Sequence, residues 1–358
     1  MCSLFDMTKD FECYLVGGAV RDRLLRRAIG DRDWVVVGSS QSQMKALGYL
    51  PVGKNFPVYL HPETKEEYAL ARKELKVGLG HSGFEVDDSS TITLEEDLFR
   101  RDLTINAIAE DVHGQLIDPF NGLADIEKKV LRHVSEAFVE DPLRVFRVAR
   151  LAAELPDFSV AEETRELMSV VSQKGELTQL SAERVWLEMV RALGAFRPET
   201  FFDVLDSCFG LTDWFPELIG RDIAFTDGDS IDRYCELNLS RDSFDALGKR
   251  LKSPKSYLIA SRYWSSYNKL IKQWQSASQE DLYDCLEKMK VFHETKHVDR
   301  LLNLASRHGS YEFEMLRSIV VDLCSLELGL DREALMSREI GSVIKEKRIE
   351  WLKEQYRN

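Results

Sequence analysis

The chain has 358 residues, of which 44% are hydrophobic and 30% charged, a globular composition that excludes collagen-like, low-complexity and disulfide-stapled proteins. With 61 acidic and 48 basic residues the formal net charge is −13, so a polyanion must be bound by local basic clusters against an unfavourable overall charge. The six cysteines form no CxxC pair and indicate free thiols in a reducing compartment. We find no signal-peptide pattern and no run of about 18 apolar residues, so we expect a cytoplasmic protein that does not cross a membrane.

Short β-rich runs alternate with glycine turns up to about residue 140. Strands are predicted at 14–16, 34–37, 56–60, 68–71 and 116–117. Residues 76–83, rich in glycine, are predicted to form a mobile loop.

From Asp141 onward the apolar residues recur at helical spacing almost to the end of the chain. Val145, Phe146, Val148, Ala149 and Ala152 give one apolar helix face, and Ser181 is a predicted N-cap. The polar stretches 222–232 and 273–281 are predicted loops. The sequence therefore predicts a small head containing β-strands on a long helical body.

The first candidate site combines a glycine turn with two aspartates. A strand leads into Gly17–Gly18 and then into a helix that carries Arg21 in its first turn, so that backbone amides can approach an anion. Asp31 and Asp33 immediately precede the next strand, and residues i and i+2 of an extended chain point to the same side. Such a carboxylate pair beside bound phosphates suits Mg²⁺, whereas a solvated Asp-Arg-Asp turn is the alternative.

Residues 15–22 (LVGGAVRD), followed by Asp31-x-Asp33, resemble the signature of the class II tRNA nucleotidyltransferases and their poly(A) polymerase relatives. Three more motifs follow in order: RRDLTINA at 100–107, EDPLRVFR at 140–147 and SAER at 181–184. The resemblance covers about residues 13–200 and is greatest to the bacterial CCA-adding enzymes. It implies an α+β fold, in which a DNA polymerase β-like nucleotidyltransferase head with a small mixed β-sheet precedes an all-helical body and tail.

The resemblance also implies an organisation and an activity. It divides the chain into a nucleotidyltransferase head at 1–139, a helical nucleotide-selecting neck at 140–204 and a tRNA-binding body and tail at 205–358. The implied reaction is template-independent addition and repair of the 3′-terminal CCA of tRNA, using CTP and ATP and releasing pyrophosphate. Longer relatives carry a phosphohydrolase domain with an adjacent His-Asp pair, and this sequence has no His-Asp dipeptide, so that activity is not expected.

Residue roles follow from the same resemblance. Asp31 and Asp33 are expected to bind two Mg²⁺ ions, and Glu67 matches the family's third catalytic carboxylate. The residues expected to position the triphosphate are Gly18, Arg21, Arg101, Arg147 and Arg150, with Asp102 bracing the head. In the last helix, Lys345, Lys347 and Arg348 are candidates for RNA phosphate contacts, with a solvated helix surface as the alternative.

Arg144, Arg147 and Arg150 recur every three residues and so lie on one face of the predicted helix. Like charges at this spacing repel, so an anion is expected against them, the alternative being a solvated stripe. Asp141 and Arg144 offer an acceptor and a donor that match the amine and ring nitrogen of cytosine and adenine, which guanine and uracil reverse. Asp141 also precedes Pro142, so an N-cap role is the alternative.

One motif competes with this interpretation. Residues 293–297 (HETKH) fit the HExxH zinc pattern, but position 303, where a metzincin has its third histidine, is Asn303, leaving Glu312 or Glu314 as possible ligands.

The functional alternatives are a CC-adding or A-adding specialist, a poly(A) polymerase, and a non-catalytic RNA-binding protein. The loop at 76–90 favours full CCA addition, because CC-adding relatives lack it. Asp31 and Asp33 argue against the non-catalytic alternative, which would not need them.

Overall fold

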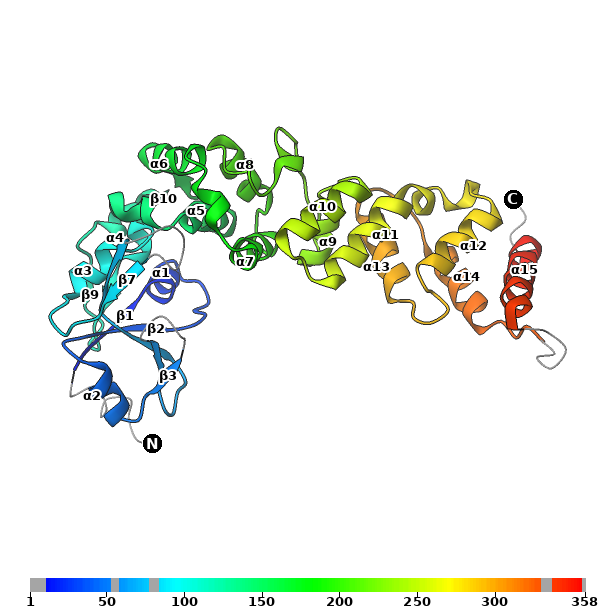
Figure 1. The fold of residues 1–358 in the computed structure, drawn as a ribbon. Helices are drawn as coiled ribbons and strands as arrows, with labels where there is room; N and C mark the ends of the chain where they lie inside the picture. The colour runs from blue at the N-terminus through cyan, green and yellow to red at the C-terminus, as the bar shows by residue number, and fades with distance from the viewer. Residues whose placement is uncertain (1–10, 53–57, 77–83, 330–336, 356–358) are drawn as a thin grey trace. The chain divides into compact units, whose positions relative to one another are not determined.

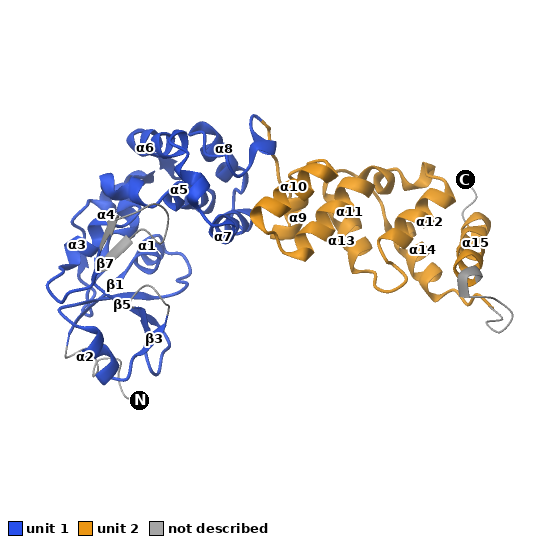
Figure 2. Cartoon of the chain, in the orientation of Figure 1, with its two compact units in different colours: residues 1–220 blue, residues 221–358 orange. Residues whose placement is uncertain are grey.

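Two units make up the chain, Met1–Gly220 and Arg221–Asn358 (Figure 2). The computed structural model describes residues 11–52, 58–76, 84–329 and 337–355. The boundary expected from the sequence at residue 204 falls inside α8 (Glu199–Ser207), whose Phe201 packs on Phe146 and Phe215, so this helix belongs to the core of unit 1.

A mixed β-sheet forms the head of unit 1 (Figure 1). Among the described residues it has seven strands in the order β3-β4-β5-β2-β1-β8-β9. Their bounds are β1 Glu12–Val16, β2 Asp33–Val37, β3 Leu50–Val52, β4 Val58–Leu60, β5 Glu67–Leu70, β8 Ala109–Glu110 and β9 Leu116–Ile117. The predicted α+β class is confirmed, and so are the strands at 14–16, 34–37, 68–71 and 116–117; of 56–60, residues 58–60 form β4 and the rest lies outside the described part.

The central strand β2 is buried on both faces of the sheet. Val36 packs with Tyr59, Tyr68 and Met44 of α2 (Gln41–Ala46), and Val35 packs on the opposite side with Leu98 of α3 (Leu94–Phe99). β2 runs antiparallel to β1 and parallel to β5. The first residue of β2, Asp33, therefore lies beside the end of β1 and the start of β5.

The segment predicted as a loop at 76–90 is partly a hairpin. β6 (Lys73–Lys76) pairs antiparallel with β7 (Phe84–Asp87), and residues 77–83 between them lie outside the described residues. The prediction was wrong for 84–87, where Phe-Glu-Val-Asp alternates apolar and acidic residues with the period of a strand.

Helices follow the sheet in unit 1, as α1 Gly18–Leu24, α4 Gly122–Lys128, α5 Leu143–Glu154, α6 Glu162–Gln173 and α7 Ala182–Leu193. Short pieces complete it: β10 Val130–Leu131, β11 Ser159–Val160, η2 Thr104–Asn106, η3 Glu136–Glu140, η4 Glu176–Gln179 and η5 Pro216–Leu218. The predicted apolar face of α5 is buried, and the predicted cap is confirmed, because the Ser181 hydroxyl accepts from the Arg184 N–H. This packing leaves the polar face of α5 for the cleft described below.

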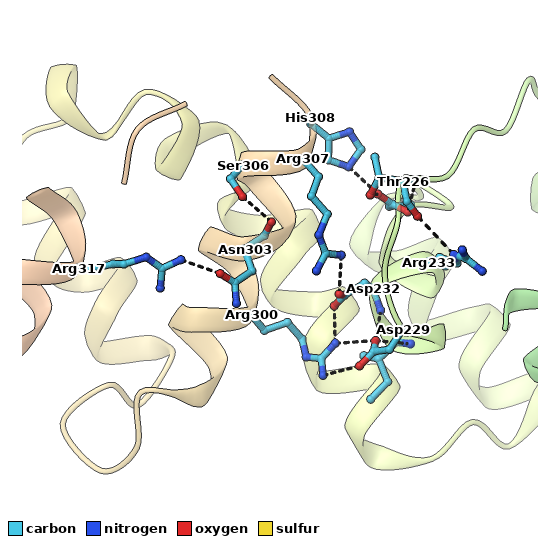
Figure 3. Close-up of polar contacts among 12 residues, drawn as sticks. Thr226, Asp229, Asp232, Arg233, Arg300, Asn303, Ser306, Arg307, His308 and Arg317 are labelled. Atoms are coloured by element: carbon cyan, nitrogen blue, oxygen red, sulfur yellow. Dashed lines mark hydrogen bonds and ion pairs between the residues drawn. The ribbon is translucent and has the colours of Figure 1, made fainter. Parts of the chain in front are cut away.

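Unit 2 is helical, with α9 Ser230–Cys235, α10 Arg241–Leu251, α11 Lys255–Lys272, η6 Trp274–Ser276, α12 Gln279–Lys288, α13 Lys296–Arg307, α14 Glu314–Ser325 and α15 Ser337–Gln355. The predicted loops at 222–232 and 273–281 are shorter than expected, since α9 begins at Ser230 and α12 at Gln279. Figure 3 shows why the polar residues before and in α9 are ordered: Arg300 and Arg307 of α13 both bind Asp232, whose side chain is 7% exposed. These ion pairs attach α9 to α13.

Basic residues of α15 are used within unit 2. Lys345 pairs with Asp284 at 2.6 Å, Lys353 pairs with Glu280, and Lys347 donates to the Leu328 carbonyl at 2.6 Å. The third residue expected to contact RNA, Arg348, lies over the ring of Phe292. These contacts hold the last helix within unit 2, and the RNA contacts expected of its basic residues stay a prediction. In the described part of the chain, no helix combines the length and the apolar character needed to cross a membrane.

Candidate active site

The register of two parallel strands places two carboxylates side by side. Asp33, the first residue of β2, lies opposite Glu67, the first residue of β5. Burial, then Glu67 and then the nearby Asp31 raise the pKa of Asp33, with Arg101 and Arg147 acting against them. Asp33 and Glu67 therefore lie side by side at one edge of the sheet. Asp31 precedes the strand, acts on the charge of Asp33, and is not among the described residues that line the adjoining cleft.

The glycine turn lies beside these carboxylates. Gly17 has φ +71°, a left-handed conformation that glycine adopts without strain, and a Cβ there would lie 3.2 Å from Nη1 of Arg101. Arg21, in α1, donates to Asn106 at 2.7 Å and pairs with Asp22 at 2.9 Å. Both guanidinium groups are thus held against the turn that leads from β1 into α1.

A cleft of about 590 Å³ connects the turn with α5 and α7. Of the residues predicted for the site, it is lined by Gly18, Arg21, Asp33, Glu67, Arg101, Asp141, Arg144, Arg147 and Arg150. Among the described residues nine arginines and four carboxylates line this cleft, so it is strongly cationic within an acidic chain.

The arginine stripe of α5 has carboxylate partners in the protein. Arg147 binds Asp102 at 2.7 Å, and Arg150 binds Glu188 of α7 at 2.6 Å and Glu154 at 2.7 Å. The anion expected against the stripe is therefore present without a nucleotide, and the side chain of Arg150 is only 9% exposed. Arg147 is 36% exposed and presents more of its surface to the cleft.

Asp141 and Arg144, the residues expected to read the base, also line the cleft. One Asp141 oxygen accepts from the Leu143 N–H at 3.1 Å, as a helix cap does, and the other accepts from Arg184 at 2.9 Å. Arg144 donates to the carbonyls of Ala137, at 2.5 Å, and Arg100. Both proposed roles of Asp141 are compatible, because each carboxylate oxygen has a second lone pair and a guanidinium has five N–H donors.

Sequence reasoning missed four cleft residues, Arg72, Arg100, Arg184 and Arg191. The helix α7 carries charged residues at i, i+4 and i+7, namely Arg184, Glu188 and Arg191. This spacing puts them on one helix face, which faces the arginine stripe of α5 across the cleft. That charged face was the signal available in the sequence.

The HExxH pattern does not form a zinc site of the expected kind. α13 begins at Lys296, so His293 and Glu294 precede the helix and the two histidines do not share one helix face. His297 instead contacts Glu294 at 3.3 Å. Within the described residues, no group of three or more His, Cys, Asp or Glu side chains is arranged to hold a metal ion. The carboxylates of the cleft are included in this statement: three of them do not lie close enough together to form a ready-made metal site.

The chain is similar in sequence to known proteins. Residues 13–132 match the family model described as the poly(A) polymerase head domain. The "CCA-adding enzyme" of Pseudomonas putida is 40% identical over 365 residues, covering 96% of this chain and 98% of that protein. The "Multifunctional CCA protein" of Pseudoalteromonas atlantica is 57% identical over 209 residues, 58% of this chain, and this chain spans about half (52%) of its length.

A solved structure has the same fold. It is described as "The structure of CCA-adding enzyme apo form II", and it superposes with a TM-score of 0.72 at 21% identity, covering 98% of this chain and 89% of that one.

The Asp102–Arg147 pair predicts a pH-dependent stability. Burial alone would raise the pKa of Asp102, but Arg147 and Asn106 lower it below its usual range. Because the folded pKa lies below the unfolded one, the contribution is complete at neutral pH and is lost as the pH falls through the folded pKa. We expect Asp102→Asn to lower the free energy of unfolding by about 1–3 kcal/mol at neutral pH, and the deficit to shrink below about pH 4.

Denaturant unfolding at several pH values measures this deficit. Asp157→Asn, which removes an exposed pair with Lys129, is the control and should lower the free energy of unfolding by much less than Asp102→Asn does. A deficit for Asp102→Asn that stays constant or grows in acid contradicts the prediction.

Proposed function

The chain belongs to the family of the CCA-adding enzymes, and from this we propose that it adds and repairs the 3′-terminal CCA of tRNA from CTP and ATP, without a template and with release of pyrophosphate. One observation carries the proposal: Asp33 and Glu67 lie side by side at the edge of a cleft lined by arginines. Carboxylates opposite cations suit a reaction in which a metal ion and a triphosphate meet.

We propose that Asp33 and Glu67, together with the neighbouring Asp31, would hold a divalent cation, Mg²⁺. Their donors are carboxylate oxygens, which hard cations prefer. Burial and then the neighbouring carboxylates raise the pKa of Asp33, a cost that a bound cation relieves. When bound, the cation lowers the pKa of the RNA 3′-hydroxyl and stabilises charge on the leaving pyrophosphate.

The remaining site residues bind and select the nucleotide in this proposal. Arg21, Arg101, Arg147 and Arg150 orient the triphosphate beside the amides of the Gly17–Gly18 turn. Asp141 accepts from the exocyclic amine of cytosine or adenine, while Arg144 donates to the ring nitrogen. The protein therefore chooses the base itself, as template-independent addition requires.

Removing either aspartate tests the reaction. With tRNA lacking its last three nucleotides, we expect the wild-type chain to add two nucleotides from CTP alone, none from ATP alone and three from both. Asp31→Ala and Asp33→Ala should each abolish incorporation, because cation binding is lost. Product length on a sequencing gel is the measurement, and Glu127→Ala, an exposed carboxylate of α4, is the control.

The same assay separates the alternatives. Long products from ATP alone would indicate a poly(A) polymerase, which the head-domain match also allows, and products stopping after two nucleotides would indicate a CC-adding enzyme. Full incorporation by both aspartate variants would remove the basis of the metal assignment.

Exchanging the base-reading pair tests nucleotide selection. Asp141→Ala and Arg144→Ala should each narrow the preference for CTP over UTP by at least about tenfold, a loss of one hydrogen bond to a charged group. Competition between labelled CTP and UTP measures this ratio. Arg165→Ala, on α6 and outside the cleft lining, is the matched control, and an unchanged ratio in both variants refutes the base-reading role.

We further propose that unit 2 binds the body of the tRNA in the cytoplasm, where its described cysteines, all free, are expected to stay reduced. A hollow of about 310 Å³ between α10, α11 and α12 is lined by Arg241, Arg262, Lys288, Tyr263 and Tyr267, with Ile259 and Ser266. Three cations around two aromatic rings suit an RNA backbone, and such clustering is needed in a chain with a net charge of −13.

Neutralising this hollow tests the tRNA contact. The double variant Arg241→Ala/Lys288→Ala should weaken tRNA binding and lower the slope of log affinity against log salt by roughly one per lost phosphate contact. The control Lys345→Ala/Lys353→Ala removes the same charge from lysines that are ion-paired within unit 2. Equal effects of the two double variants would show that net charge, and not the hollow, governs binding.

A further inference from the structure

Asp97 is a buried carboxylate with no role in the function described so far. It lies in α3, and its side chain is 0% exposed. A buried carboxylate is costly unless charged groups and hydrogen bonds compensate it. The groups that compensate the charge of Asp97 therefore indicate what this carboxylate does in the protein.

Two consecutive arginines bind it from the cleft side. Oδ1 accepts from Nη2 of Arg100 at 2.6 Å and from its Nε at 3.2 Å, and Oδ2 accepts from Nη2 of Arg101 at 3.1 Å. Oδ1 also lies 3.4 Å from the backbone N–H of Arg72. Burial alone would raise the pKa of Asp97, but Arg100 and Arg101 lower it, so the carboxylate is ionised at neutral pH.

Arg101 connects this anchor with the triphosphate end of the cleft. Nη2 is bound by Asp97, while Nη1 approaches Gly17 and the guanidinium lowers the pKa of Asp33. Its Nε is buried and has no hydrogen-bond partner in the described part of the protein. Among the described residues, Asp97 is therefore the carboxylate that hydrogen-bonds this cation and holds it at the turn.

Arg100 connects the same anchor with the base-reading end. Its side chain is held by Asp97 and by the Arg72 carbonyl, which accepts from Nε at 3.1 Å. Its own carbonyl accepts from Nη2 of Arg144. Fixing the Arg100 residue thus fixes one of the carbonyl acceptors that orient Arg144.

We propose that Asp97 is a positioning residue shared by both ends of the site, aiming Arg101 at the triphosphate and, through the backbone of Arg100, aiming Arg144 at the base. Asp97 touches neither ligand itself. The inference rests on the proposed function for the identity of the nucleotides, and the geometry of the anchor is independent of it.

Equilibrium binding separates a shared anchor from a merely structural carboxylate. Titration calorimetry measures the affinity for inorganic tripolyphosphate, which reports on the triphosphate end, and the ratio of the CTP and UTP affinities, which reports on the base end. For Asp97→Asn we expect both the tripolyphosphate affinity and the CTP-to-UTP affinity ratio to fall at least about tenfold. Arg101→Gln should reduce mainly the tripolyphosphate affinity, and Arg144→Gln mainly the CTP-to-UTP ratio.

Asp125→Asn is the matched control. Asp125 is also buried in the head, bonded to Thr104 at 2.7 Å and to Arg132, and it does not line the cleft. It should lower the melting temperature without changing either binding quantity. If Asp97→Asn does not fold, Asp97→Glu, which keeps the charge and moves it by one methylene group, carries the test.

The outcomes are distinguishable. A change in both quantities supports the shared anchor. A change in one alone, or a loss of stability with neither changed, overturns it. These titrations measure binding and need no catalytic turnover. If the wild-type chain adds no nucleotide to tRNA, the proposed function fails, but tripolyphosphate binding still tests the role of Asp97.

Discussion

The cleft of unit 1 has to hold many guanidinium groups close together, and like charges in a partly buried space repel one another strongly. The compensation comes from carboxylates on other elements: Asp97 on α3, Asp102 beside η2 and Glu188 on α7. All three are buried, so they have little freedom to follow a cation that moves. The cations are therefore set in position by the fold, and a nucleotide that binds them does not have to organise the site first.

The opposite charge arrangement occurs at the edge of the sheet. There the parallel register of β2 and β5 forces Asp33 and Glu67 together, and their repulsion is relieved only in part by Arg101 and Arg147. A cleft with only partly compensated carboxylates at the sheet edge and compensated arginines along its wall is suited to a ligand that brings cation and anion together. A metal-bound nucleoside triphosphate has that composition, and this match of charges links the fold to the proposed reaction.

Local patterns in the sequence predicted much of this structure, because strands, caps and helix faces depend on residues only a few positions apart. Ser181, the apolar face of α5 and the strand before Gly17 are examples. The partners of the arginines could not be predicted in this way, since Arg184 reaches Asp141 across 43 positions. The same limit applies to α9, whose polar residues are ordered by α13, and to the HExxH pattern, which a helix start at Lys296 divides.

The central claim is that the carboxylates and the arginine-lined wall together receive one metal-bound nucleotide. A crystal structure with CTP and Mn²⁺, collected at a wavelength where manganese scatters anomalously, tests it most directly. The account predicts an anomalous peak within about 2.0–2.3 Å of oxygens of Asp31 and Asp33, bridged to a triphosphate that contacts Arg101. Manganese bound elsewhere, or a triphosphate lying outside the arginine-lined cleft, would contradict it.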